Sequence, residues 1–175
     1  MSLLVDYRPL SLVRVAPAED ALARPKPSRI GIAALQMALS ERGHGEHGGN
    51  NVGPDVDRYR RVASPSGRTD PWCGWFASWC LEEGCKRIVS PCPVERSGSA
   101  RVLWLRCCDA GARVDSPLPG DLGLVKRPGG HHIFFVWQIV EPPRYLTIEG
   151  NHAPVVEDFK RVLTAPELVG FARLP

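Results

Sequence analysis

The chain has 175 residues, of which 43% are hydrophobic and 23% are charged, and its formal net charge is +3. These values are typical of a globular protein that is long enough to bury a substantial core. Arginine and lysine are scattered along the chain rather than clustered, which argues against a nucleic-acid-binding surface. No segment approaches the run of about 18 apolar residues that a membrane span needs.

Residues 1–27 are rich in proline and lack a clear hydrophobic period. We interpret them as an N-terminal arm that precedes a single domain over residues 28–175. The first residues do not have the basic start and uninterrupted apolar stretch of a signal peptide. We therefore expect synthesis in the cytoplasm.

Four helical segments are predicted in the first two thirds of the chain. Ser28 is a good N-cap for a helix that runs to about Arg42 and ends at Gly43. A short helical turn follows at 55–62, and Ser97 to Cys108 can form a later helix. The helix between these two carries the most informative cysteine.

That helix is predicted over 71–83, with Asp70 as its N-cap, Pro71 at its first position and Gly84 as its stop. Cys73 then lies in the first turn, at the positive end of the helix dipole. A thiol placed there is expected to ionise more easily, and the thiolate is the nucleophilic form. The unpaired N–H groups of the same turn could hold a developing oxyanion.

Beyond residue 116 the pattern changes to short apolar runs that are separated by proline and glycine turns. The predicted strands are 121–125, 132–140, 144–148, 154–159 and 168–174. Because helices come first and strands second, we expect an α+β domain with an antiparallel sheet.

A cysteine nucleophile needs a base, and histidine is the usual one near neutral pH. His131 and His132 open the longest predicted strand, and alternation allows only one of them to face Cys73. Glu149 and Asn151 follow the next strand and, being two residues apart, can point to the same side. Either could fix the tautomer of the histidine, although Glu-Gly-Asn is also a common turn sequence.

The remaining aromatic and cysteine residues admit two interpretations each. Trp72 and Trp75 could line a substrate groove near Cys73 or could simply pack in the core. The six cysteines are expected to be reduced because no export signal precedes them. A structural zinc site is the alternative, although the chain contains no Cys-x-x-Cys pair. That site would use Cys80, Cys85, Cys92 and the histidines.

Four motifs in order, PWCGWFASWC, LPGDLGLV, GGHHIFFV and TIEGN, resemble those of CHAP-type cysteine amidases over about residues 29–174. These enzymes are papain-like peptidoglycan hydrolases related to the NlpC type. The resemblance implies a papain-like, NlpC-like α+β fold in which N-terminal helices pack on a small antiparallel sheet. It also implies hydrolysis of an amide bond in peptidoglycan, as an amidase or an endopeptidase.

Carried over residue by residue, the resemblance implies that Cys73 is the nucleophile and that a histidine of the 131–132 pair is the base. His132 fits the following run of residues better, and Glu149 and Asn151 would orient and polarise it. The predicted catalytic residues are therefore Cys73, His132, Glu149 and Asn151, and the predicted binding residues are Trp72, Trp75 and His131.

We expect no cofactor and no catalytic metal, and a monomer that binds peptidoglycan or a peptide. Action on the cell wall would then require lysis or a non-standard export route. Two alternatives remain at this point. One is a cysteine peptidase or transferase that acts on an amide outside the wall. The other is an inactive CHAP-like binding module, for which Phe134 is the support, because the family often has a small residue there and a ring would narrow the site.

Overall fold

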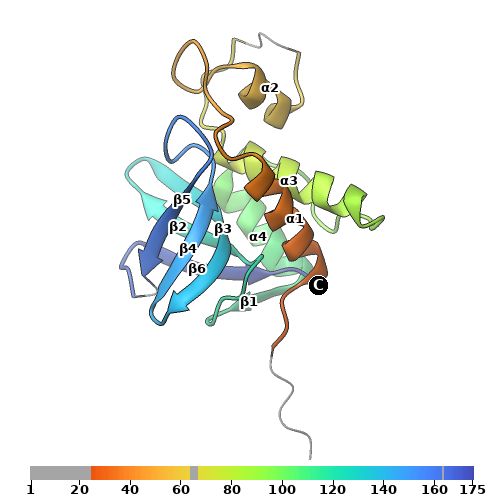
Figure 1. The fold of residues 1–175 in the computed structure, drawn as a ribbon, viewed down its shortest axis with the longest axis vertical. Helices are drawn as coiled ribbons and strands as arrows, with labels where there is room; N and C mark the ends of the chain where they lie inside the picture. The colour runs from red at the N-terminus through yellow and green to blue at the C-terminus, as the bar shows by residue number, and fades with distance from the viewer. Residues whose placement is uncertain (1–24, 64–66, 163) are drawn as a thin grey trace, which may run out of the picture.

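The computed structural model describes residues 25–63, 67–162 and 164–175, so most of the predicted N-terminal arm lies outside the described residues. Within these ranges, four helices precede or flank a six-stranded sheet (Figure 1). The helices are α1 (Arg29–Ser40), α2 (Pro54–Arg60), α3 (Cys73–Arg87) and α4 (Ala100–Ala110). The strands are β1 (Ala112–Val114), β2 (Leu122–Arg127), β3 (Gly130–Glu141), β4 (Arg144–Glu149), β5 (Glu157–Val162) and β6 (Leu168–Arg173).

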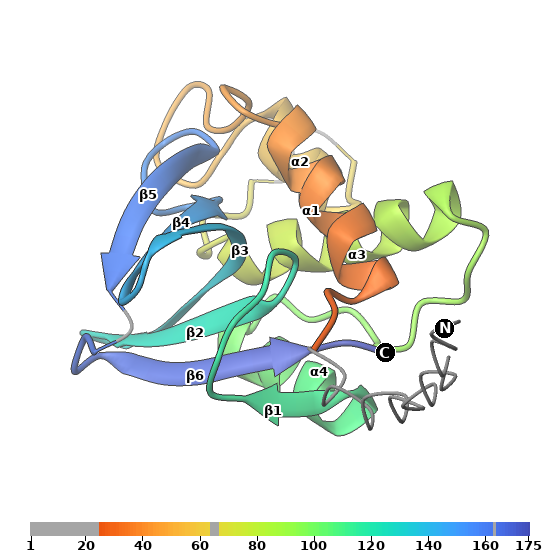
Figure 2. The ribbon, with the colours of Figure 1, turned by 60° about the horizontal axis from the view of Figure 1, so that its bottom comes forward.

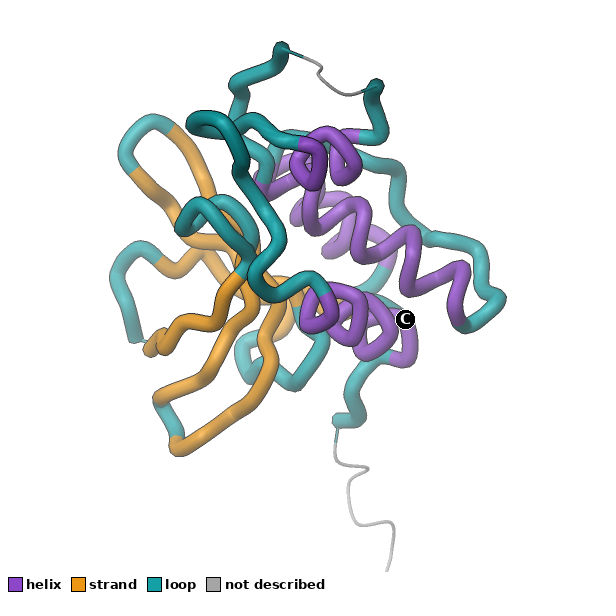
Figure 3. Tube along the Cα trace, turned by 45° about the horizontal axis from the view of Figure 1, so that its top comes forward, coloured by secondary structure: helices purple, strands orange, loops and turns teal. Residues whose placement is uncertain are grey.

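The strands form one antiparallel sheet in the order β1-β6-β2-β3-β4-β5. The helices gather on one side of this sheet, as Figures 2 and 3 show. The predicted α+β class is confirmed. Strand β1 was not predicted, because three residues are too few to show an alternating pattern. No helix of the described ranges combines the length and the apolar character that crossing a bilayer would need.

Both faces of β3 are buried, which explains why alternation along this strand could not identify its core side. Ile133 and Phe135 belong to the main core between the sheet and the helices. Phe134 and Val136 belong to a second cluster on the opposite face of the sheet. His132 shares that second face, because side chains alternate along a strand.

Two serines cap helix starts, of which Ser28 was predicted. The Ser28 hydroxyl accepts the Gly31 N–H at 3.0 Å and donates to the carbonyl of Pro175 at 2.9 Å, which joins the start of α1 to the end of the chain. Ser99 caps α4 by accepting the Val102 N–H at 3.4 Å. The observed helices differ from the predicted bounds mainly by a few residues at their ends.

Helix α3 corrects two sequence predictions. It begins at Cys73 rather than Pro71, and it continues through Gly84 to Arg87. A Cβ atom on Gly84 would lie 2.6 Å from the backbone nitrogen of Ala34, so the glycine permits the close crossing of α1 and α3. Gly84 is therefore a packing residue and not a helix stop.

Replacing Gly84 with alanine should destabilise the fold, because the added methyl group meets backbone atoms that cannot move aside. We expect the free energy of unfolding, measured by urea denaturation, to fall by about 1–3 kcal/mol. Gly130→Ala is the matched control, since a Cβ there meets nothing within 4 Å. Equal losses in the two variants would contradict this account of the helix crossing.

Candidate active site

Two adjoining pockets meet at Cys73 and form a cleft. We call the first, of about 270 Å³, the α4 pocket; it is lined by Asp70, Pro71, Cys73, Gly98, Ser99, Ala100, Arg101, Gly130 and His131. We call the second, of about 210 Å³, the hairpin pocket; it is lined by Pro71, Cys73, Arg127, Pro128, Gly129, Gly130, His131, His132 and Asn151. Cys73 lines both pockets, together with Pro71, Gly130 and His131.

Cys73 is the first residue of α3, and only 5% of it is exposed. Burial raises the pKa of its thiol, while N–H groups of Ile133, Gly74 and Cys73 itself and the charge of Arg127 oppose that rise. The predicted easier ionisation of a helix-start thiol is therefore wrong for this resting state. Desolvation of the thiolate outweighs the favourable dipoles around it.

His132 lines the hairpin pocket together with Cys73 and is 2% exposed. Its Nε2 atom is 2.8 Å from Oε2 of Glu149. Burial lowers the pKa of His132, and the charges of Arg127 and Arg161 add to that effect, while Glu149 opposes it. The imidazole is therefore neutral near pH 7. No hydrogen bond joins it to the Cys73 thiol among the hydrogen bonds of the described residues.

Glu149 is fully buried at the end of β4. Burial alone would raise its pKa, but the hydrogen bonds and charges of His132 and Arg161 hold the pKa at about 2. Because an ionised carboxylate only accepts, Nε2 of His132 must carry the shared hydrogen. The Nδ1 atom of the neutral ring is then left as a proton acceptor, which is what a general base requires.

Arg161 on β5 completes this arrangement and was missed by sequence reasoning. Its Nε and Nη2 atoms each donate to one oxygen of Glu149, both at 2.6 Å. The Thr147 hydroxyl also donates to the carboxylate. The alternating exposure of β5 places Arg161 on the inward side. From sequence alone, a charged residue is expected to be exposed. The partner of Arg161 becomes visible only when β4 and β5 are paired.

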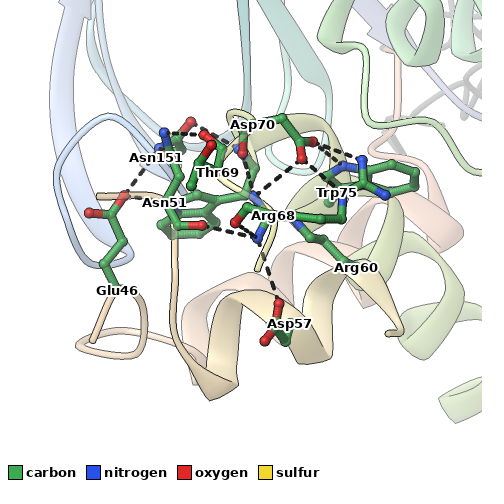
Figure 4. A network of polar contacts seen from close by, with 10 residues as sticks. Glu46, Asn51, Asp57, Arg60, Arg68, Thr69, Asp70, Trp75 and Asn151 are labelled. Atoms are coloured by element: carbon green, nitrogen blue, oxygen red, sulfur yellow. Dashed lines mark hydrogen bonds and ion pairs between the residues drawn. The ribbon is translucent and has the colours of Figure 1, made fainter. Parts of the chain in front are cut away.

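Among the hydrogen bonds of the described residues, none joins Asn151 to the imidazole that it was predicted to orient. Its Oδ1 atom accepts the backbone N–H of Trp72 at 3.0 Å, directly before the nucleophile. Its amide nitrogen donates to Asn51 at 2.7 Å and to Glu46 at 3.4 Å (Figure 4). Asn151 has a φ of 64°, a conformation that asparagine tolerates better than most residues. The residue therefore positions the start of α3.

A buried guanidinium holds the segment before Cys73 from the other side. Arg60 donates to the carbonyls of Asn51 at 3.0 Å, of Arg68 at 3.3 Å and of Asp70 (Figure 4). It also lies 3.7 Å from the carboxylate of Asp57. The Asp70 side chain does not cap α3 as predicted. Its carboxylate pairs with Arg68 and accepts from an indole of α3, so it braces the loop rather than the helix start.

The predicted binding residues differ in their access to the cleft. Trp72 is fully buried, stacks on Tyr59 at 5.6 Å and donates to Glu46, so it offers no surface to a ligand. The half-buried ring of Trp75 packs against Gly98, behind the α4 pocket, and donates to the Asp70 carboxylate. Neither tryptophan lines either of the two pockets at Cys73, which favours the packing interpretation. His131 lines both pockets.

Phe134 does not narrow the cleft, contrary to expectation. Its ring lies over Gly123, where a Cβ would come within 2.2 Å of it, and it packs near Tyr145 at 6.2 Å. It lines neither pocket at Cys73. The observation that favoured an inactive module is therefore removed.

One group of side chains has the spacing of a metal site. In the described part of the chain, ligand atoms of His132, Glu149 and His152 lie within 4.8 Å of one another. However, Arg161 binds the carboxylate and Arg127 contacts Nδ1 of His152, so two cations crowd the position. This charge disfavours a metal ion. The alternative zinc site is not supported either, because the described residues contain no such group that includes a cysteine.

No family model and no curated protein matches the chain. Among solved structures, a Staphylococcus aureus protein described as similar to an NLP/P60 family lipoprotein aligns with 87% of this chain, at 16% identity and a TM-score of 0.46. The chain spans 44% of that protein.

The depressed pKa of Glu149 predicts that acid destabilises the fold. The carboxylate has a pKa of about 2 when folded and an ordinary pKa of 4.5, so its contribution to stability is present above pH 4.5 and is lost as the pH falls towards 2. Between pH 7 and pH 3 this loss amounts to about 2 kcal/mol.

Glu149→Gln should unfold more easily at pH 7, because it leaves Arg161 without its carboxylate, and its stability should change less between pH 7 and pH 3. Urea denaturation at the two pH values measures both effects. Glu141→Gln is the control, since that side chain is 79% exposed. An acid dependence in Glu149→Gln equal to that of the wild type would contradict the assignment.

Proposed function

We propose that this protein is a cysteine hydrolase that cleaves amide bonds, with Cys73 as nucleophile, His132 as general base and Glu149 as the group that orients the base. The observation that carries this proposal is the buried 2.8 Å contact between His132 and Glu149, in the same pocket as a helix-start cysteine. A base fixed by a carboxylate beside a thiol is the arrangement that nucleophilic catalysis requires.

The reaction starts from a neutral thiol and a neutral imidazole, because burial disfavours both charged forms. Nδ1 of His132 takes the thiol proton as sulfur attacks the carbonyl carbon, and the electron pair of the C=O bond moves to oxygen. Backbone N–H groups at the start of α3, including that of Cys73, stabilise the oxyanion. Catalytic hydrogen bonds are often longer before substrate binds, so the missing thiol–imidazole bond is compatible with this step.

The oxyanion then collapses and expels the amine, which takes the proton from the imidazolium. A thioester between Cys73 and the acyl group remains. A water molecule gives a proton to His132 and attacks the thioester, which releases a carboxylic acid and restores the thiol. Throughout these steps Glu149 stabilises the imidazolium through Nε2, and Arg161 keeps Glu149 ionised.

The substrate class rests on the four motifs that resemble CHAP-type amidases, and we propose an amide bond of peptidoglycan. The cleft is compatible with a linear stem peptide, because it continues on both sides of Cys73. The bond cleaved would be either the sugar–peptide amide or a peptide bond.

Purified bacterial sacculi provide the direct test. The wild type should release new amino groups, while Cys73→Ala and His132→Ala should slow release by about 10²-fold or more, since each removes a reacting group. His131→Ala is the matched control and should retain far more activity than His132→Ala.

Activity that survives in Cys73→Ala would contradict the proposed nucleophile. Equal losses in the two histidine variants would contradict the choice of base. Hydrolysis of unrelated peptides but not of sacculi would support the cysteine-hydrolase mechanism and would contradict peptidoglycan as the substrate.

A further inference from the structure

Arg127 places a positive charge close to the nucleophile, and no ion pair of the described residues includes it. It is the last residue of β2 and lines the hairpin pocket with Cys73 and His132. Its guanidinium is half-buried, and its one side-chain hydrogen bond within the described residues goes to Nδ1 of His152. The charges of Glu149 and Glu167 act on it, but neither carboxylate forms an ion pair with it in the described part of the chain.

The neighbouring arginine shows what Arg127 lacks. Arg161 is bound through two nitrogens by both oxygens of Glu149, which uses the one buried carboxylate of this region. Burial and the charge of Arg161 lower the pKa of Arg127. Glu149 is thus paired with Arg161, and in the described part of the chain Arg127 faces the cleft without a carboxylate of its own. A half-buried cation gains most from an anionic ligand that displaces its water.

His152 holds this guanidinium in place. Its Nδ1 atom contacts Nη2 of Arg127, and its ring packs edge-to-face on Phe159 at 3.9 Å. Burial, together with the nearby cations, lowers the pKa of His152 to about 4, so it remains a neutral acceptor at physiological pH. A guanidinium has five N–H donors, and this contact leaves a pair of them available for a bidentate ligand.

We propose that Arg127 is a specificity residue that binds a free carboxylate on the amine side of the scissile amide. The amine side follows from the proposed function, on which this inference rests: the imidazolium of His132 protonates the departing amine, and His132 and Arg127 line the same pocket. The substrate class is therefore an amide whose amine-side residue carries a free carboxyl group.

The first test compares alkylation of Cys73 by iodoacetate and by iodoacetamide, which differ in charge but hardly in size. The quantity compared is the ratio of the iodoacetate rate to the iodoacetamide rate. For Cys73 of the wild type this ratio should be about tenfold higher than for a small free thiol, because one charge-assisted contact is worth about 1.5 kcal/mol. Arg127→Gln should abolish that preference. The ratio of the two rates cancels any change in thiol ionisation, and peptide mapping identifies the alkylated cysteine.

Lys126→Gln is the matched control, because it removes one positive charge from the adjacent position, which is exposed and outside both pockets. It should keep the preference for iodoacetate. An equal loss of preference in both variants, or no preference in the wild type, would overturn the carboxylate site. Either result leaves the proposed hydrolase function standing, because iodoacetamide alone reports the reactivity of Cys73.

The second test does not need a reactive cysteine. In Cys73→Ser, propionate should shift the ¹⁵N–H resonance of the Arg127 Nε atom, and propionamide should not. The corresponding resonance of Arg101, in the α4 pocket, serves as the internal control. Equal shifts at the two arginines would mean unspecific anion binding and would overturn the proposal.

The side of the scissile bond on which the carboxylate lies is determined by mass spectrometry of sacculus digests. The residue with the new amino group should carry a free carboxylate. A new amino-terminal residue without a free carboxylate would overturn the assignment of Arg127 to the amine side.

Discussion

The buried carboxylate of Glu149 is the constraint on which the base side of the cleft depends. A fully buried charge is costly unless hydrogen bonds and opposite charge compensate it. Here the donors come from β3 through His132, from β5 through Arg161 and from β4 through Thr147. The carboxylate therefore fixes the tautomer of the base and ties three neighbouring strands together at the same point. The same buried carboxylate therefore orients the proposed base and stabilises this part of the sheet.

The Glu-Gly-Asn tripeptide joins the base side to the nucleophile side. Glu149 holds the imidazole, while Asn151 accepts the N–H of Trp72 and so fixes the start of α3. Gly150 lies between them, where a Cβ would come within 2.6 Å of the Trp72 ring and 2.8 Å of the Phe76 ring. The absence of a side chain at Gly150 lets the strand end approach the helix. The distance between base and nucleophile is thus set by one short segment.

Much of this arrangement could be predicted from the sequence, because local patterns determine it. Proline, glycine and N-cap signals indicated the helices and strands. The strand ends placed a histidine of the 131–132 pair near Glu149 or Asn151, and the resemblance to CHAP-type amidases favoured His132. Arg161, Arg60 and the second role of Asn151 could not be predicted. Asn151 acts through partners that are far away in the chain, such as Asn51, which lies 100 positions before it. The partners of Arg60 and Arg161 are only about ten positions away, but they meet through the folding of a loop and the pairing of two strands, which no local pattern shows.

Two predictions failed for the same physical reason, which is that burial is a tertiary property. Gly84 has the sequence signature of a helix stop, but it serves the crossing of α1 and α3. Cys73 has the helix position of an activated thiol, but burial raises its pKa. The resting site is consequently a neutral pair, in which the acceptor nitrogen of His132 carries the catalytic role.

The protonation state of His132 tests this account most directly, and ¹⁵N NMR of the imidazole measures it. At pH 7 the account predicts a neutral ring with its hydrogen on Nε2 and with Nδ1 unprotonated. The Glu149→Gln variant should weaken that tautomeric preference. A ring with its hydrogen on Nδ1, or one protonated at both nitrogens at pH 7, would contradict the proposed general base.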